Sequence, residues 1–219
     1  MKFFFKLIIL IFLTNSCLGQ DFSANYTIKT KGLTIGQLYW EIKLFNEGYT
    51  TLIKLKNKGF ISAFYKFEGK YQTKGRYLNK VFLPSEYNQR WVTNKKRRDV
   101  SLFFKNNKVY DLKIKPEEKE LPRIAFKNYE DYKDPLTSFI NILLNDKKSK
   151  TIDGRRMYVM NPLKKNSTTK ILIEDYRNIW ADHKRNDLEY LEIFRNKNEP
   201  LPKKLNIKFK GSVFSLIKN

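Results

Sequence analysis

The side chains that could do chemistry in this chain are mostly carboxylates. Glycoside cleavage needs two carboxyl groups that flank the scissile bond, one as acid and one as base or nucleophile. Nothing in the spacing of the acids brings any two of them together, so a carbohydrate-acting hydrolase is the least favoured hypothesis. The candidates for such a pair are Glu41, Glu86, Asp134, Asp153 and Glu174.

Nucleophilic and metal-assisted chemistry lack their usual residues. The chain holds one His, His183, in the polar stretch WADHKRND, and one Cys, Cys17. A Ser-His-Asp triad would have to use His183, and no G-x-S-x-G elbow accompanies it. Zinc sites draw on several His or Cys ligands, which this chain cannot supply. Because glycine motifs for nucleotides are also missing, we expect no catalytic residue, no metal and no cofactor.

The stretch KTIDGRRMYV, residues 150–159, gathers charge around a glycine. It could be a charged binding site or a tight turn that leads into a strand. Gly154 would accept a positive φ there, and Asp153 would hydrogen-bond to nearby backbone. On a strand over 155–160, alternation sends Arg155 and Arg156 to opposite faces, where they cannot easily clamp one ligand. We therefore predict a turn and hairpin.

The elements that position these residues are mostly strands, because apolar residues alternate with period two along the chain. Segments 32–45 and 49–57 predict an antiparallel hairpin. The period becomes helical over 135–145, with Asp134 as N-cap and Pro135 at the first helical position. We predict a mainly β fold: a strongly curved antiparallel sheet or partial barrel of about ten strands, covered by one main helix near 135–145.

Aromatic residues crowd the first half of the chain. A curved sheet with one covering helix need not fill its concave side, so large inward aromatics could close the core. They could instead line a cavity for an acyl chain or another apolar ligand. The residues predicted to form such a lining are Trp40, Phe64, Phe67, Trp91 and Phe104.

The N-terminus has the layout of a secretory signal. Lys2 and Lys6 precede the apolar run over 7–13, and small polar residues follow. Cleavage after Gly19 would leave one β-rich domain, residues 20–219, without Cys. The rival hypothesis makes Cys17 a lipid-modified first residue. We expect an exported protein, periplasmic or associated with the outer envelope. We expect no membrane span in the mature chain, because the run itself is shorter than a spanning helix and no later segment comes closer to that length.

The formal net charge of +22 raises the question of an anionic partner. Nucleic acid is not expected, because the charges are spread along the chain and no nucleic-acid motif is present. The basic residues could form an ordinary solvated surface. They could also attract an anionic envelope component such as lipid head groups.

Several segments together resemble an exported bacterial family known only as domain of unknown function 3108. They include KGFISAFYKFEGKYQTKG, LPSEYNQRW, DPLTSFI, TIDGRRMYVM and PKKLNIKFKGSVFSL. The resemblance implies an envelope protein rich in antiparallel strands and carries no activity. The signature residues expected to be structural are Gly36, Asp134, Pro135, Asp153, Gly154, Arg155 and Arg156.

The leading hypothesis from the sequence is a non-enzymatic envelope protein whose curved sheet binds an apolar or amphipathic ligand, such as a lipid. The alternative is an interaction or structural protein that docks on anionic envelope components through a basic surface. A continuous apolar cavity favours the first hypothesis, and a filled core with a one-sided basic patch favours the second.

Overall fold

The structure is a computed structural model that describes residues 19–219 except 166–167, 182 and 197–198. The predicted secretory segment up to residue 18, with Cys17, lies outside the described residues. Within the described ranges, no helix combines the length and apolar character that crossing a membrane requires.

The described chain forms one antiparallel sheet with one α-helix and two short 3-10 helices. The predicted fold class is confirmed, but the sheet has 13 strands where about ten were predicted. The strands are β1 (Gln20–Thr30), β2 (Leu33–Phe45), β3 (Gly48–Asn57), β4 (Phe67–Leu78), β5 (Val81–Thr93), β6 (Arg97–Lys105), β7 (Lys108–Lys115), β8 (Ser149–Ile152), β9 (Arg156–Lys165), β10 (Thr168–Asn178), β11 (Leu188–Phe194), β12 (Lys204–Phe209) and β13 (Ser212–Lys218). The helices are η1 (Phe60–Ala63), η2 (Phe126–Asn128) and α1 (Pro135–Asn145).

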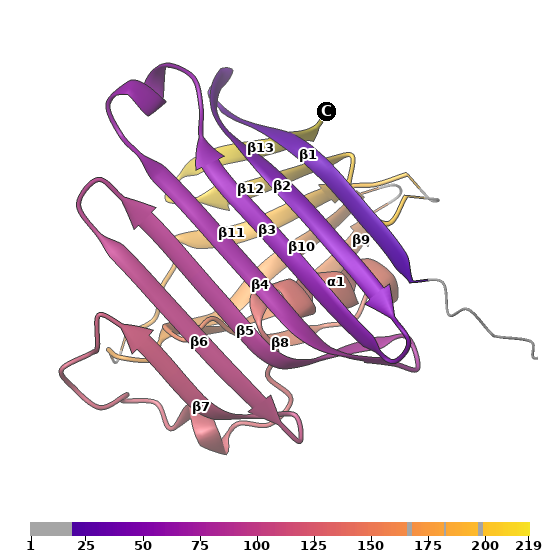
Figure 1. Cartoon of the computed structure of the whole chain (residues 1–219), viewed down its shortest axis with the longest axis vertical. Coiled ribbons are helices and arrows are strands. Elements are labelled where there is room, and N and C mark those ends of the chain that lie inside the picture. Colours follow the sequence, from indigo (N-terminus) through magenta and orange to yellow (C-terminus); the bar gives the residue numbers. More distant parts are fainter. Residues whose placement is uncertain (1–18, 166–167, 182, 197–198) are drawn as a thin grey trace, which may run out of the picture.

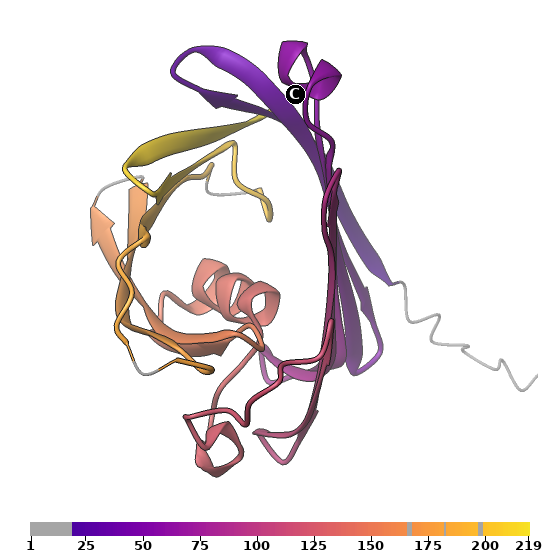
Figure 2. The same cartoon turned by 90° about the vertical axis from the view of Figure 1, so that its left-hand side faces the viewer.

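The sheet consists of two meanders joined by one ladder. Its strand order is β7-β6-β5-β4-β3-β2-β1-β13-β12-β11-β10-β9-β8, so β1 and β13 are the only neighbours that are not consecutive among the described strands. Figure 1 shows the long, nearly flat wall of β1–β7, and Figure 2 shows β8–β13 curling round to face it. Helix α1 lies between the two walls (Figure 2). The result is a rolled sheet with an interior, which we call the barrel.

The alternation of the sequence decides which face of each strand is buried. On β2, Leu38, Trp40 and Ile42 are buried and point into the barrel, while the residues between them are partly exposed. Strands β2 and β3 pair antiparallel from Gly36 opposite Asn57 onward. The predicted hairpin is therefore confirmed.

Helix α1 starts and ends where the sequence predicts. Asp134 accepts hydrogen bonds from the amides of Leu136 and Thr137, at 3.0 and 3.1 Å, and so caps the helix. Asp146 ends it in the left-handed conformation, with φ of 50°. The helix is buried from Leu136 to Leu143, because it lies inside the rolled sheet rather than on its outside.

The two edge strands, β7 and β8, are not paired with each other. Segment 116–134 fills the gap between them: Glu130 bridges to Lys108 on β7, and Lys133 bridges to Thr151 on β8. The amide of Asp131 also donates to the carbonyl of Asn107 at 3.0 Å. The segment thus covers both open edges, which would otherwise expose unpaired backbone groups.

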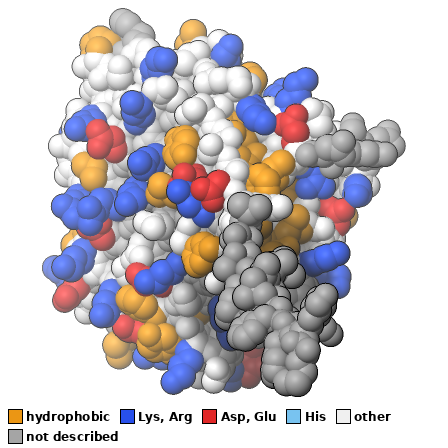
Figure 3. All heavy atoms as spheres, turned by 45° about the vertical axis from the view of Figure 1, so that its right-hand side comes forward, with side chains coloured by type: hydrophobic (Ala, Val, Ile, Leu, Met, Phe, Trp, Pro, Cys, Tyr) orange, Lys and Arg blue, Asp and Glu red, His pale blue; other side chains and the backbone are white. Residues whose placement is uncertain are grey.

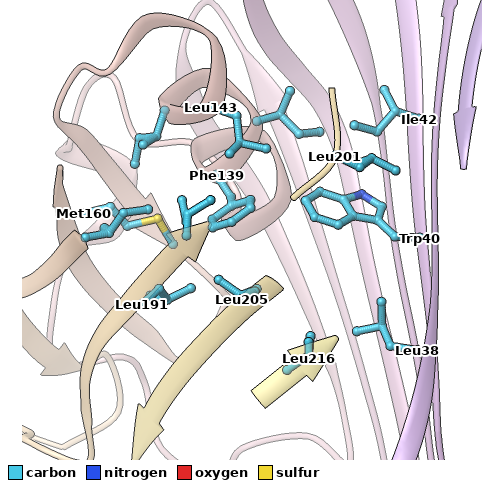
Figure 4. Packing of buried hydrophobic residues seen from close by; sticks show 14 of the residues in the cluster. Leu38, Trp40, Ile42, Phe139, Leu143, Met160, Leu191, Leu201, Leu205 and Leu216 are labelled. Atoms are coloured by element: carbon cyan, nitrogen blue, oxygen red, sulfur yellow. The ribbon is translucent and has the colours of Figure 1, made fainter. Parts of the chain in front are cut away.

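Two clusters of buried apolar residues fill most of the interior. In the first, side chains of β2 face those of α1 and of β9–β13, and Trp40 packs against Phe139 with ring centroids 5.5 Å apart (Figure 4). The second lies where β6, β7 and η2 meet β8 and β9, around Leu102, Phe126 and Met157.

Candidate functional site

The interior is not completely filled. Between α1 and the two walls lies a cavity of about 240 Å³, and its floor includes Pro135, Leu136 and Phe139 of the helix. Trp40 lines one side and Leu205 the other, and these two side chains approach from opposite walls in Figure 4.

A second, larger cavity of about 520 Å³ lies farther toward the end of the barrel that carries η1. Leu38, Ile207 and Leu216 line both cavities, so the two adjoin. We call them together the hollow. Phe67, Phe209 and Phe214 are also in the lining of its larger part.

The lining of the hollow carries almost no polar group that needs a ligand. Tyr26 donates its hydroxyl to the Pro202 carbonyl at 2.9 Å. Burial raises the pKa of Tyr71 to about 12 and raises the pKa of Tyr158 well above its ordinary value, so both phenols are neutral at physiological pH. An apolar ligand could therefore bind in the hollow without leaving buried polar atoms unpaired.

Gly36 shows how closely the strands approach at the hollow. A Cβ atom at this position would lie 2.7 Å from the Lys56 carbonyl oxygen, so only glycine fits beside β3. Gly36 also lines the larger cavity. Close packing of the β2 and β3 backbones thus requires glycine at this position.

Of the five aromatics predicted to line a cavity, the structure places two on the hollow. Trp40 lines the inner part and Phe67 the outer part. Trp91 is half-buried, 6.1 Å from Phe67 between ring centroids and beneath the Arg98 guanidinium. Phe104 belongs to the second core cluster.

Phe64, the fifth predicted lining residue, is 70% exposed in the connection after η1. The hollow instead uses apolar side chains of β12 and β13 that sequence reasoning did not single out. Leu205, Ile207, Phe214 and Leu216 supply one wall. The alternation of apolar residues along these strands predicts which side chains point inward. No local signal in the sequence says whether those side chains border a cavity or pack against other atoms.

Asp134 ties the floor of the hollow to the flat wall. Its carboxylate accepts a hydrogen bond from the Thr73 hydroxyl of β4 at 2.7 Å and another from the Thr137 hydroxyl. The Thr137 hydroxyl also lies 2.6 Å from the Tyr49 hydroxyl of β3. Burial raises the pKa of Asp134, although these hydrogen bonds oppose the shift. The group therefore anchors α1 inside the barrel.

The Asp153–Gly154 stretch is a tight turn, as predicted. The Asp153 carboxylate accepts from the amides of Arg155 and Arg156 at 2.8 and 2.7 Å, and Gly154 has φ of +84°. A Cβ on Gly154 would lie 2.5 Å from the Val100 side chain, so the turn packs tightly against the opposite meander.

The two arginines of this turn face different partners. Arg155 pairs with Glu118, whereas the guanidinium of Arg156 lies 3.6 Å from the Asp153 carboxylate. The strand begins at Arg156, one residue later than predicted. The signature residues of this stretch thus close the fold between the two meanders.

Three of the acids considered for carbohydrate chemistry are held in separate ion pairs. Glu41 pairs with Lys43, Glu86 with Lys74 and Glu174 with Lys148. His183 is exposed. Among the residues that the structure describes, no three His, Cys, Asp or Glu side chains gather as a metal site would need.

The outer face of the flat wall carries a row of like charges. Register places Lys54 opposite Lys70, and Lys70 opposite Arg90. Within the described part of the chain, Arg90 pairs with Asp99 at 2.6 Å, and neither lysine has an ion-pair partner. All three line a groove of about 440 Å³. Elsewhere Lys and Arg are interspersed with acids, as Figure 3 shows for one side of the molecule.

Comparison with known proteins supports both the fold and the resemblance seen in the sequence. The family model described as protein of unknown function (DUF3108) matches residues 25–192. The crystal structure of a beta-barrel-like protein of domain of unknown function DUF1849 from Brucella abortus is similar, with a TM-score of 0.51 at 11% identity, over 90% of this chain and 94% of that one. No curated protein matches the chain. The 13-stranded barrel described here belongs to the DUF3108 family of proteins of unknown function.

Proposed function

We propose that this protein binds an apolar or amphipathic ligand, such as a lipid, in the hollow, and that it acts as a non-enzymatic component of the cell envelope. The observation that carries the proposal is the hollow itself. Its larger part, about 520 Å³, falls within the range of about 300–1,000 Å³ that is usual for small-molecule sites.

The side chains that line the hollow favour a hydrocarbon ligand over a polar one. Aromatic and aliphatic side chains from both walls converge on the space, and the phenols beside it are neutral. Burial of an apolar chain contributes about 25 cal/mol for each Å² removed from water. The hollow can therefore supply affinity without a charged partner in its interior.

The expected place of action comes from the N-terminal sequence. A basic start followed by an apolar run is typical of an export signal, so we assign the protein to the periplasm or the outer envelope. An apolar site suits that place, because lipids there must cross water between membranes.

The experiment compares two neighbouring positions on β13. Leu216 is buried and lines the hollow, whereas Ile217 is 37% exposed on the other face. Leu216→Trp should fill the space and lower the affinity for the uncharged probe N-phenyl-1-naphthylamine at least tenfold. Ile217→Trp should leave this affinity unchanged. Circular dichroism would verify that both variants are folded.

Native mass spectrometry of the protein released gently from cells gives a second readout. We expect a copurifying mass in the range of a lipid in the wild type and its loss in the Leu216→Trp variant. A wild-type protein that carries no such mass and also ignores added lipids and the probe would refute the proposal.

The outer row of cations supports a second candidate function. Like charges directly opposite on a sheet destabilise it, so Lys54 and Lys70 repel each other across β3 and β4, whereas Arg90 is already paired with Asp99. An anionic envelope component, such as a phosphorylated glycan, would bind in this groove. Lys54→Gln with Lys70→Gln should abolish salt-sensitive binding to such a glycan, while probe binding in the hollow continues. Unchanged glycan binding in this variant would refute the second candidate.

A further inference from the structure

Three connections meet at one end of the barrel, and each exposes apolar side chains. They are the β1–β2 turn, the η1 connection between β3 and β4, and the β12–β13 turn (Figure 1). Leu33 is 68% exposed, and Tyr65 and Val213 are also exposed. Phe64 lies beside Tyr65 in the same connection and is exposed as well. We call these four residues the tip residues.

Hydrogen bonds fix two of these connections beside β1 and β2. The amide of Lys58 donates to the Ile35 carbonyl at 3.0 Å, which fixes the η1 connection beside the start of β2. The hydroxyl of Thr30 donates to the Val213 carbonyl at 3.0 Å, which fixes the β12–β13 turn beside the end of β1. The tip residues therefore lie on one end of the molecule and not on separate surfaces.

The same connections are basic and contain no acid. Segments 29–33, 58–66 and 208–213 hold no Asp or Glu. Their six lysines are Lys29, Lys31, Lys58, Lys66, Lys208 and Lys210. Exposed apolar side chains and lysines thus occur together in these three connections.

The opposite end of the barrel has a different composition. Three of its turns, 46–47, 79–80 and 106–107, contain Glu47, a single Lys and four Asn residues. Phe45 is exposed there at the far end of β2 from Leu33. These three turns thus hold one Lys, where the three connections at the end nearer the larger cavity hold six.

We propose that this end docks on an anionic lipid bilayer. Apolar side chains at loop tips can enter the boundary between head groups and acyl chains, and lysines around them meet the lipid phosphates. The absence of acids from the three connections fits this partner, because an anionic surface would repel them. Tyr65 also lines the larger cavity, so docking would bring that cavity next to the bilayer.

The inference does not require a ligand in the hollow, so it can be tested separately from the proposed function. Residues 20–219 carry every strand, helix and core residue described, so a chain that begins at Gln20 keeps the whole fold. It also lacks the apolar N-terminal run, which would bind vesicles by itself. Co-sedimentation would use vesicles of phosphatidylcholine with and without phosphatidylglycerol.

We expect binding only to the vesicles that contain phosphatidylglycerol, and weaker binding as salt rises. Lys31→Gln with Lys58→Gln should lower the partition coefficient about 30-fold, since each Lys near such a surface corresponds to about a fivefold change. Leu33→Ser with Phe64→Ser should lower it at least about tenfold.

Matched controls carry the same changes at the opposite end. Phe45→Ser removes the exposed apolar residue from the far end of β2, and Lys80→Gln with Lys105→Gln removes two lysines near the turns there. Both controls should bind vesicles like the unsubstituted chain. Equal losses at the two ends, or no binding to anionic vesicles at all, would overturn the docking proposal. Probe binding that persists in that case would leave the proposed function standing.

Discussion

Asp134, which anchors α1 inside the barrel, gives the sharpest test of what positions the helix beside the hollow. We consider Asp134→Ala, which removes the N-cap of the helix and the acceptor for the Thr73 hydroxyl. The change affects a buried position that links the helix to β4 across the interior. It therefore tests stability and the floor of the hollow together.

The structure sets the size of the effect. Loss of an N-cap costs about 1 kcal/mol. Thr73 is fully buried, and within the described part of the chain its hydroxyl donates to Asp134 alone, so leaving this hydroxyl unpaired costs about 1–3 kcal/mol more. Thr137 keeps its contact with the Tyr49 hydroxyl at 2.6 Å and adds little. We expect a total loss of about 2–4 kcal/mol, from a stability of about 5–15 kcal/mol that is typical of a domain.

Urea unfolding followed by tryptophan fluorescence measures this loss. Asp146→Asn at the other end of α1 is the control, because Asn also adopts the left-handed conformation and the contact of Asp146 with Lys164 is largely exposed. It should change stability by less than about 0.5 kcal/mol. A loss below about 1 kcal/mol in Asp134→Ala would refute the assignment of Asp134 as the anchor. Weaker probe binding in that variant would connect the anchor to the hollow.

Three further outcomes are expected. Because burial raises the folded-state pKa of Asp134, the wild type should gain stability relative to Asp134→Asn as pH falls through that pKa, and a pH-independent difference in urea midpoints would contradict this. Gly154→Ala should cost at least about 2 kcal/mol, since it forces a positive φ and a clash with Val100; thermal melting measures the loss, and a loss under about 1 kcal/mol would count against the turn as described. Trp40→Phe should cost about 1–2 kcal/mol in urea, because the indole loses its 3.1 Å hydrogen bond to Thr51, and an unchanged midpoint would show that this bond contributes nothing.

The sequence predicts those parts of the fold that depend on neighbouring residues alone. The helix boundaries follow from the Asp134 cap, from Pro135 and from an apolar stripe with helical spacing, and these need no knowledge of the rest of the chain. The turn at Gly154 follows from conformational preference in the same way. The hairpin of β2 and β3 follows from strict alternation around a short turn.

The strand count failed where the local signal is weak. Strand β8 has only four residues, and β1 alternates around the small Ala24 with many polar residues. Gly211, which the sequence marks as a turn or a bulge, is a turn that separates β12 from β13. These strands are fixed by their neighbours in the sheet rather than by their own residues.

The hollow was beyond sequence reasoning for a similar reason. Leu38 and Leu216 meet across it although nearly the whole chain separates them. Alternation says that both point inward, but whether facing side chains touch depends on the spacing of the two walls. Phe64 was predicted to line the cavity because it is aromatic, but the structure places it at the exposed tip.

The ladder between β1 and β13 has a consequence for the order in which the molecule assembles. All other strand neighbours are consecutive in the chain, so each meander can form from local hairpins, whereas this ladder joins Tyr26 to Lys218. Closing a loop of that length costs about 5 kcal/mol of chain entropy. This cost arises before the contacts between the meanders form and offset it. Folding should therefore pass through two separate meanders, and the β1 and β13 amides should be the last to become protected from hydrogen exchange. The hollow would then come into existence only in this final step.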